Sequence, residues 1–107
     1  MPPTSESKNK FKAKLFKALS DPVRIEILEF LRDGEKCVCE IIPHVKLIQP
    51  VVSRDLKILK EVGVVRFRKD GNRRLYSITD QQIFRIIDGV SPELADIFKA
   101  KMLEQII

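Results

Sequence analysis

The chain has 107 residues, of which 44% are hydrophobic and 33% are charged. This length suits one compact domain, and this composition predicts an ordinary globular core rather than disorder. No apolar run approaches the ~18–20 residues that cross a bilayer, and the polar amino terminus lacks the apolar segment of a secretory signal. Two cysteines and one histidine exclude a disulfide scaffold and any site that needs two histidines. The sequence therefore predicts a small soluble protein of the cytoplasm, without membrane contact.

The positive charge is concentrated in one segment. The chain has a net charge of +5, and residues 53–76 hold eight basic and three acidic residues, so this segment accounts for the whole excess. A local excess of this kind indicates a polyanionic partner that is bound through its phosphates. A solvated basic face is the alternative that charge alone leaves open.

Two amphipathic helices are predicted near the start of the chain, after a flexible tail over residues 1–10. Apolar residues recur at helical spacing between Phe11 and Leu19, with lysines between them. Ser20-Asp21-Pro22 then supplies a capping side chain and a first-turn proline for a second helix. Gly34 is placed to end that helix in a left-handed conformation.

A third and a fourth helix follow, each next to a proline. Pro43 predicts that the third helix, after Cys37, is short or kinked, and Pro50 suits the first turn of a fourth helix that runs to about Val62. On a helical wheel the fourth helix has two different sides. The side predicted to face the core carries Val52, Leu56 and Leu59. The exposed side carries Pro50, Ser53, Arg54, Lys57 and Glu61. A polar, cationic face of this kind indicates a helix that contacts a partner.

The apolar period changes to two after Gly63, which predicts a β-hairpin. Apolar residues alternate with arginine over Val65–Arg68, and a second strand follows the turn Asp70-Gly71-Asn72. The tip and edges of this hairpin are strongly basic. Thr79-Asp80-Gln81-Gln82 then has the form of a capping box before another helix, and Ser91-Pro92 opens the last one.

Four helices, a basic hairpin and two further helices follow the order of a winged helix-turn-helix. The predicted fold is mainly α with a β-hairpin wing, in the order α-α-α-α-β-β-α-α, and residues 11–107 form a single domain. In this architecture the exposed face of the fourth helix enters the DNA major groove, which is ~12 Å wide, and the hairpin reaches the flanking backbone or minor groove. The residues predicted to contact double-stranded DNA are Gln49, Pro50, Ser53, Arg54, Lys57, Arg68, Lys69, Asn72, Arg73 and Arg74.

The segment from Leu15 to Ile78 resembles the ArsR/SmtB family of metalloregulator-type repressors. The resemblance rests on Leu19–Leu28, Cys37–Ile41, Gln49–Leu59, Gly63-Val64-Val65 and a wing that ends Tyr76-Ser77-Ile78. It implies a homodimeric transcriptional repressor that binds a palindromic operator and whose inducer weakens that binding. It also implies that the first and last helices form the dimer interface, and their apolar stripes are too large to stay exposed. The interface residues are then Phe11, Leu15, Leu19, Leu94, Ile97, Phe98 and Met102.

Three residues depart from the family pattern. Lys46 stands where a turn glycine is common, and Ile48 stands where a capping serine or threonine is common. Asp55 replaces the frequent histidine of the fourth, DNA-reading helix. These departures bear on the operator sequence and on the geometry at the start of that helix.

Cys37 and Cys39 are the candidate sensing residues. In arsenic-sensing members of the family a similar Cys-Val-Cys opens the helix before the reading helix, usually with a third cysteine at the position of Ile42. Arsenite, antimonite or another thiophilic metal favours thiolates, but two sulfurs leave the site incomplete unless water, an exogenous thiol or His44 contributes. The family's other metal site, at the dimer helices, needs histidines, and residues 79–107 contain none.

Two further interpretations of the cysteine pair stay open. A reversible disulfide between the two residues would make the protein a redox sensor. Alternatively, both are small buried hydrophobic residues without a sensing role, in a DNA-binding regulator with inert cysteines.

Two other classes of function compete with DNA binding. A winged-helix protein-interaction or dimerisation module has the same order of elements, but the basic hairpin tip favours DNA. An enzyme such as a thiol oxidoreductase is not expected, because the sequence has neither a Cys-x-x-Cys on a βαβ pattern nor a glycine-rich phosphate loop.

Overall fold

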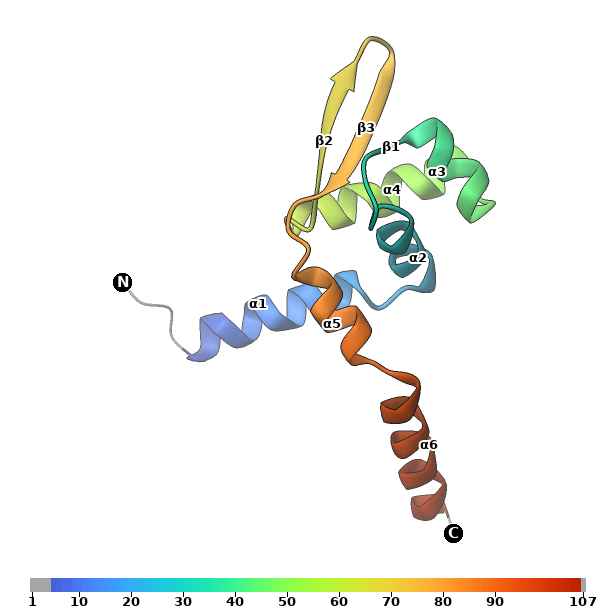
Figure 1. Cartoon of the computed structure of the whole chain (residues 1–107). Helices are drawn as coiled ribbons and strands as arrows, with labels where there is room; N and C mark the ends of the chain where they lie inside the picture. Colours follow the sequence, from blue (N-terminus) through green and yellow to red (C-terminus); the bar gives the residue numbers. More distant parts are fainter. Residues whose placement is uncertain (1–4, 107) are drawn as a thin grey trace.

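The computed structural model describes residues 5–106 and contains the predicted elements in the predicted order, with one additional strand (Figure 1). The elements are α1 (Ser5–Ala18), α2 (Pro22–Phe30), β1 (Lys36–Cys37), α3 (Val38–Val45), α4 (Gln49–Glu61), β2 (Val65–Asp70), β3 (Arg73–Ile78), α5 (Ile83–Gly89) and α6 (Pro92–Ile106). Helices α2–α4 and the hairpin form the central body, from which α1 and α6 project in different directions. Within residues 5–106, no helix combines the length and the hydropathy that crossing a membrane requires.

Helix α1 is longer than the spacing of its apolar residues predicts. It begins at Ser5 rather than at Phe11, and an ion pair between Lys10 and Glu6 (3.3 Å) spans one turn near its exposed start. The tail expected over residues 1–10 is therefore helical from Ser5 onward, and residues 1–4 lie outside the described part of the chain. Polar residues continue the helix without adding an apolar face, so the spacing of apolar residues gives no signal for this turn.

Helix α2 is capped as predicted at its start but ends earlier than expected. Asp21 accepts a hydrogen bond from the N–H of Val23 (3.2 Å), and Pro22 occupies the first turn. The helix ends at Phe30, so Gly34 does not terminate it directly. Gly34 has a φ of +146° and lies in the turn that leads into β1.

The capping box predicted before α5 does not form. The hydroxyl of Thr79 donates a hydrogen bond to the carbonyl oxygen of Gly63 (2.6 Å), which connects the end of β3 to the segment after α4. Asp80 accepts from the N–H of Gln82 (2.9 Å), and α5 begins at Ile83 without a side-chain cap. The local pattern predicts that the hydroxyl of Thr79 caps the helix. In the structure this hydroxyl instead bonds to a distant part of the chain.

The wing belongs to a three-stranded antiparallel sheet in the order β1-β3-β2. Strands β2 and β3 pair along their whole length, as the hairpin prediction requires. On the other edge of β3, Lys36 of β1 lies opposite Tyr76 and Cys37 lies opposite Leu75. Strand β1 was missed because two residues are too few to show an alternating pattern. It connects the start of α3 directly to the wing.

The core lies between α2, α3, α4, α5 and the base of the wing. The apolar side of α4 is buried as the helical wheel predicts, with Val52, Leu56 and Leu59 each at most 1% exposed. Helix α1 buries only Ala18, and α6 buries none of its described residues. The central body thus has a buried core within one copy of the chain, whereas the two projecting helices contribute little to that core.

Helix α5 is tied by Arg32 to the turn that follows α2. The guanidinium of Arg32 donates two hydrogen bonds to the carboxylate of Asp88 (2.7 and 3.0 Å) and lies 4.1 Å from the ring centroid of Phe84. The hydrogen bonds from Arg32 hold the pKa of Asp88 below its usual value. This exposed link contacts α5, the helix that precedes α6 in the chain.

The turn between α3 and α4 adopts a conformation that its residues do not favour. Lys46 ends α3 in the left-handed region (φ 58°, ψ 40°), and among residues 5–106 it is the one non-glycine residue with positive φ. Ile48, the N-cap of α4, supplies no side-chain hydrogen bond. A left-handed conformation costs a residue with a Cβ about 1–2 kcal/mol, and a missing cap costs about 1 kcal/mol. The start of α4 is therefore held by tertiary packing.

Replacing Lys46 by glycine is expected to stabilise the protein. Lys46→Gly removes the clash of the Cβ, and this gain exceeds the added entropy of the unfolded chain, so the free energy of unfolding rises by roughly 0.5–1 kcal/mol. Thermal unfolding followed by circular dichroism at constant protein concentration measures the effect. Lys46→Ala keeps the Cβ and serves as the control; equal stabilisation by both variants would contradict the explanation.

Candidate nucleic-acid interface

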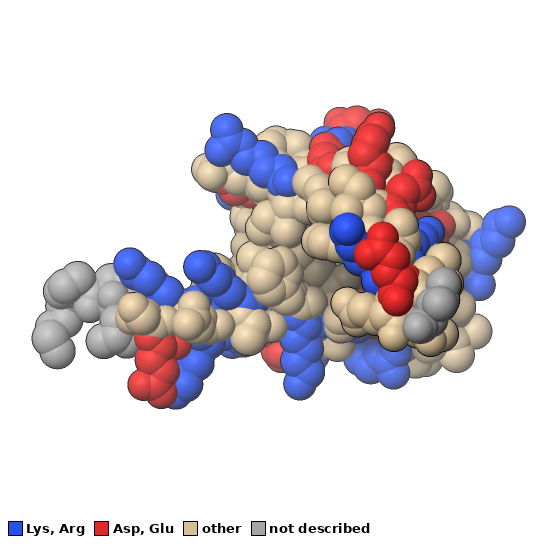
Figure 2. Space-filling model, turned by 90° about the horizontal axis from the view of Figure 1, so that it is seen from below, with Lys and Arg blue, Asp and Glu red and all other residues tan. Residues whose placement is uncertain are grey.

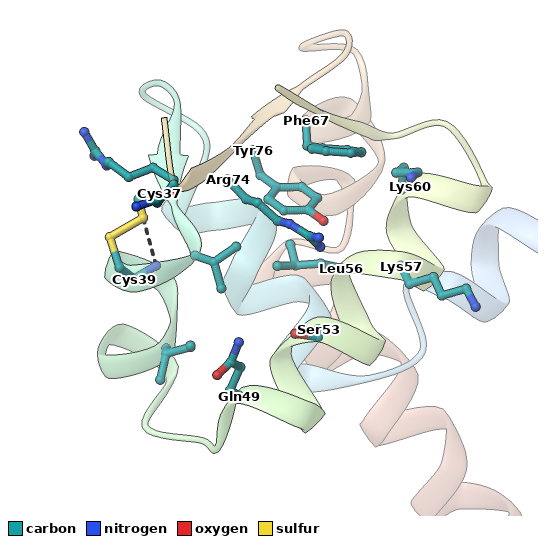
Figure 3. A pocket seen from close by; sticks show the side chains of 14 residues that line it. Cys37, Cys39, Gln49, Ser53, Leu56, Lys57, Lys60, Phe67, Arg74 and Tyr76 are labelled. Carbon is teal, nitrogen blue, oxygen red and sulfur yellow. Dashed lines mark hydrogen bonds between the residues drawn. A yellow bond between two sulfur atoms is a disulfide. The ribbon is translucent and has the colours of Figure 1, made fainter. Parts of the chain in front are cut away.

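A groove of about 810 Å³ joins the start of α3, the exposed face of α4 and the wing (Figure 3). Four cations line it, and we call it the cationic groove: Lys57, Lys60, Arg73 and Arg74. The rest of its lining consists of Cys37, Val38, Cys39, Ile42, Gln49, Ser53, Leu56, Phe67, Asn72 and Tyr76. The structure thus brings together on one surface helix α4, which is predicted to read DNA, the basic hairpin and the cysteine pair, three features that lie apart in the sequence.

The exposed face of α4 carries the side chains predicted from the helical wheel. Gln49, Ser53 and Lys57 follow one another at intervals of four residues, so they lie on one stripe of the helix, and all three line the cationic groove. Arg54 exposes 66% of its side chain, and Pro50 is also exposed. The predicted orientation of this helix is therefore confirmed, whereas contact of these residues with DNA stays a prediction.

The predicted cations of the wing are all exposed, but two of them are paired with carboxylates. The guanidinium of Arg68 donates two hydrogen bonds to Glu35 (2.8 and 2.9 Å), and Arg73 lies 3.5 Å from Glu40. The hydrogen bonds from Arg68 hold the pKa of Glu35 below its usual value. These carboxylates lie in the segment around the cysteines. That segment is far from the wing in the sequence, so no local pattern predicts the pairing. In the described part of the chain, the two remaining predicted wing cations, Lys69 and Arg74, have no ion pair, and the predicted wing residue Asn72 is uncharged.

Lys60 is a groove residue that the sequence analysis missed. Its ammonium group lies 4.6 Å from the ring centroid of Phe67, and this ring stacks on Tyr76 at a centroid distance of 5.6 Å. Lys60 follows Lys57 by three residues, so helical spacing alone places both on neighbouring parts of one face. The groove thereby has an aromatic wall covered by a cation (Figure 3).

Cys37 and Cys39 lie at the edge of the cationic groove and are joined by a disulfide bond (Figure 3). Cys37 is buried, 3% exposed, and caps α3: its sulfur accepts a hydrogen bond from the N–H of Cys39 (3.0 Å). Glu40 completes the capping box by accepting from the N–H of Cys37 (3.1 Å). Cys39 is exposed. The interpretation of both cysteines as small buried hydrophobic residues therefore fits Cys37 but not Cys39.

His44 lies apart from the cysteine pair. Its ring stacks on Phe30 at a centroid distance of 3.8 Å, and it lines a different surface, next to Glu26 and Glu29 of α2. Within residues 5–106, no group of three or more histidine, cysteine, aspartate or glutamate side chains is arranged to hold a metal ion. The residues of the described chain therefore do not form a complete metal site, and a thiophilic metal would find two protein sulfurs.

Asp55 faces the core rather than the exposed side of α4. Its fully buried carboxylate accepts a hydrogen bond from Nη1 of Arg24 (3.0 Å). Arg24 also donates to the carbonyl oxygen of Ala18 (2.6 Å) and to the carboxylate of Asp21 (3.3 Å). One guanidinium therefore connects the end of α1, the start of α2 and the buried side of α4. Asp55 therefore does not lie on the exposed face that is predicted to contact DNA, and its ion pair with Arg24 positions α4 instead.

Comparisons with known proteins agree on fold and class. Residues 21–66 match the family described as "Bacterial regulatory protein, arsR family". The chain is 45% identical over 76 residues to the uncharacterised HTH-type transcriptional regulator MJ1325 of Methanocaldococcus jannaschii, covering 70% of this chain and 85% of that protein. It is 39% identical over 67 residues to the arsenical resistance operon repressor of Staphylococcus xylosus, covering 63% of this chain and 64% of the repressor, less than two thirds of its length.

A solved structure extends this agreement to most of the chain. The homodimeric winged helix-turn-helix DNA-binding domain of Mb0332 from Mycobacterium bovis has a TM-score of 0.69 at 28% identity. The similarity covers 98% of this chain and 95% of that one. The winged helix-turn-helix fold predicted from the order of elements is confirmed.

Removing one partner of the buried Arg24–Asp55 ion pair is expected to destabilise the protein. Asp55→Leu leaves the guanidinium of Arg24 without its buried partner and should lower the free energy of unfolding by about 3 kcal/mol. The double variant Arg24→Met with Asp55→Leu should lose less than the sum of the two single variants. Urea unfolding of all four proteins gives the coupling energy.

The Arg32–Asp88 pair is the matched control, because it also joins two distant segments of the chain, the turn after α2 and helix α5, but is exposed. Its double-mutant cycle should give a clearly smaller coupling energy. Equal coupling in both cycles would show that burial gives the Arg24–Asp55 pair no special role.

Proposed function

Since the chain belongs to the arsR family of bacterial regulatory proteins, we propose that it is a homodimeric repressor that binds a palindromic operator and whose affinity is set by the state of Cys37 and Cys39. Membership makes it a DNA-binding transcriptional regulator and not an enzyme. The observation that carries the finer proposal is the cationic groove, in which the reading face, the wing and the cysteine pair share one surface.

Helix α4 has the dimensions and the chemistry of a major-groove reader. Its 13 residues are about 20 Å long at ~1.5 Å per residue, and one helix fits the groove of B-DNA. On its exposed face, Arg54 suits guanine and Gln49 suits adenine by bidentate hydrogen bonds. Lys57 and the wing cations Lys69 and Arg74 then reach phosphates, which bind without reading sequence.

The exposed apolar residues of the projecting helices α1 and α6 favour a second copy of the chain as the partner. Of the predicted interface residues, Phe11, Ile97, Phe98 and Met102 are more than half exposed, whereas Leu15, Leu19 and Leu94 are partly buried. Three more apolar residues of these helices, which the sequence analysis missed, are at least as exposed as Ile97: Phe16, Leu103 and Ile106. Lysines project from two sides of α1, with uncharged surface between them (Figure 2).

Dimerisation through these helices would cover their apolar residues and present two α4 helices to the two halves of a palindrome. The similar Mb0332 domain is homodimeric. Sedimentation of the wild type at micromolar concentration should give twice the mass of the 12.4 kDa chain. Phe98→Glu should give a monomer, because a charge then replaces an apolar contact; a monomeric wild type would contradict the proposed dimer.

The cysteine pair is placed to influence both parts of the reading surface. It borders the cationic groove, and β1 pairs Cys37 with Leu75 of the wing. Opening or closing the disulfide, or binding a thiophilic metalloid with water or an added thiol as third ligand, therefore changes a segment that contacts both α3 and the wing. The relative from Staphylococcus xylosus is an arsenical resistance repressor, which supports arsenite as the first effector to test.

Substitutions should separate sequence reading from phosphate binding. Arg54→Ala is expected to weaken binding to a selected operator duplex by ~1–3 kcal/mol while changing binding to random duplex much less, and Lys69→Ala should weaken both alike. Gel-shift titrations at two salt concentrations measure this. Lys8→Ala, which removes a charge on α1 away from the groove, is the control. Capture of a protein partner with no salt-dependent duplex binding would favour an interaction module instead.

Effectors of the cysteine pair should change DNA affinity only when both cysteines are present. Fluorescence anisotropy with the operator duplex compares the reduced protein with and without diamide, arsenite and antimonite. We expect at least one to change the dissociation constant about tenfold or more. Cys37→Ser with Cys39→Ser should bind DNA and ignore every effector. An unresponsive wild type that still binds DNA would identify a regulator with inert cysteines.

A further inference from the structure

We propose that Cys39 is a modification site for small anionic thiols: the disulfide opens by exchange at the sulfur of Cys39, which then carries a mixed disulfide while Cys37 becomes a free thiol. This inference rests on the thiol-sensing part of the proposed function, and it specifies which sulfur reacts and which class of reagent it accepts.

The two cysteine residues differ in their exposure to solvent. Cys37 is 3% exposed and lies in β1, opposite Leu75 of β3, whereas Cys39 is exposed on the first turn of α3. Thiol–disulfide exchange requires the incoming thiolate to reach one of the two sulfurs, so access decides which is attacked. The burial of Cys37 directs attack to Cys39.

The two sulfurs also differ as leaving groups. The sulfur of Cys37 accepts a hydrogen bond from the N–H of Cys39 (3.0 Å) at the N-terminus of α3, where the helix dipole favours negative charge. Negative charge that develops on Cys37 is therefore stabilised by the backbone. The neighbouring carboxylate of Glu40 opposes this charge, but Arg73 lies 3.5 Å from that carboxylate and offsets it. Departure of the Cys37 sulfur is thus the favoured direction.

The surroundings of the pair select the charge of the reagent. Both cysteines border the cationic groove, and Arg74, which has no ion pair in the described chain, points toward its middle (Figure 3). At about 810 Å³ the groove lies within the range of small-molecule sites, so it has room for a tripeptide-sized thiol with carboxylate groups. Positive lining raises the local concentration of anions and hence their rate of encounter.

The exchange is balanced without a further oxidant or reductant. The thiolate of the reagent forms a bond to the sulfur of Cys39, and the bond between the two protein sulfurs breaks. Its electron pair leaves on the sulfur of Cys37, which takes a proton from water. The reagent sulfur is oxidised to the disulfide level, and Cys37 is reduced to the thiol. The product places the reagent's carboxylates among cations that DNA phosphates would otherwise contact.

Peptide mapping of the trapped product tests which sulfur reacts. The disulfide form is mixed with reduced glutathione, quenched with excess N-ethylmaleimide at neutral pH and only then acidified. We expect glutathione on Cys39 and maleimide on Cys37 in roughly tenfold excess over the reverse arrangement. In a second measurement, Cys37→Ser and Cys39→Ser react with oxidised glutathione, and the variant that retains Cys39 should be about tenfold faster. Equal labelling or a preference for Cys37 would overturn the proposal.

The charge preference is tested by comparing glutathione with cysteamine, a cationic thiol, after each rate is divided by its rate with a small-molecule disulfide. Wild type should favour glutathione roughly tenfold. Arg74→Gln should reduce this preference, and Arg66→Gln, on the same hairpin but outside the groove, should keep it. If glutathione and cysteamine react with wild type at equal normalised rates, the proposed preference for anionic thiols is wrong. An adduct on Cys39 that leaves DNA affinity unchanged would instead refute thiol control of DNA binding while leaving the site in place.

Discussion

The pair formed by Arg24 and Asp55 fixes α4, the helix whose exposed face lines the cationic groove. Asp55 is the one charged residue that is fully buried in the described part of the chain. An unpaired charge at this depth would cost several kcal/mol, so the fold is favourable only when the guanidinium of Arg24 meets this carboxylate. The same guanidinium donates to backbone carbonyls at the end of α1 and to the N-cap of α2. Helix α4, whose exposed face is proposed to read DNA, is thereby placed relative to α1, which carries exposed apolar residues.

This placement offsets an unfavourable local sequence at the start of α4. Lys46 is in the left-handed region and Ile48 gives no cap, so the turn alone does not favour this geometry. Apolar side chains of α4 packed into the core, together with the Arg24–Asp55 pair, hold the helix nonetheless. Stability in this region therefore comes from contacts between elements rather than from the turn.

The second organising feature is the short strand β1, which makes the cysteine pair part of the wing sheet. Cys37 serves as a strand residue opposite Leu75 and as the cap of α3. Glu35 and Glu40, on either side of the pair, hold Arg68 and Arg73 of the wing by ion pairs. A chemical change at the cysteines consequently acts on a segment whose carboxylates and backbone both contact the wing. In the proposed complex with DNA, phosphates would compete with these carboxylates for Arg68 and Arg73.

The sequence alone determined the order of the elements, the buried side of α4 and the position of the hairpin. Each of these depends on residues within a few positions of one another: a helical period of apolar residues, an alternation, a glycine turn, and Asp21 before Pro22. Only the tertiary structure decided that Asp55 is a core residue, that Arg68 pairs with Glu35, that Lys60 covers Phe67 and that β1 exists. These contacts join residues that the chain brings together only after folding, and their energies depend on burial and distance, which no local pattern encodes.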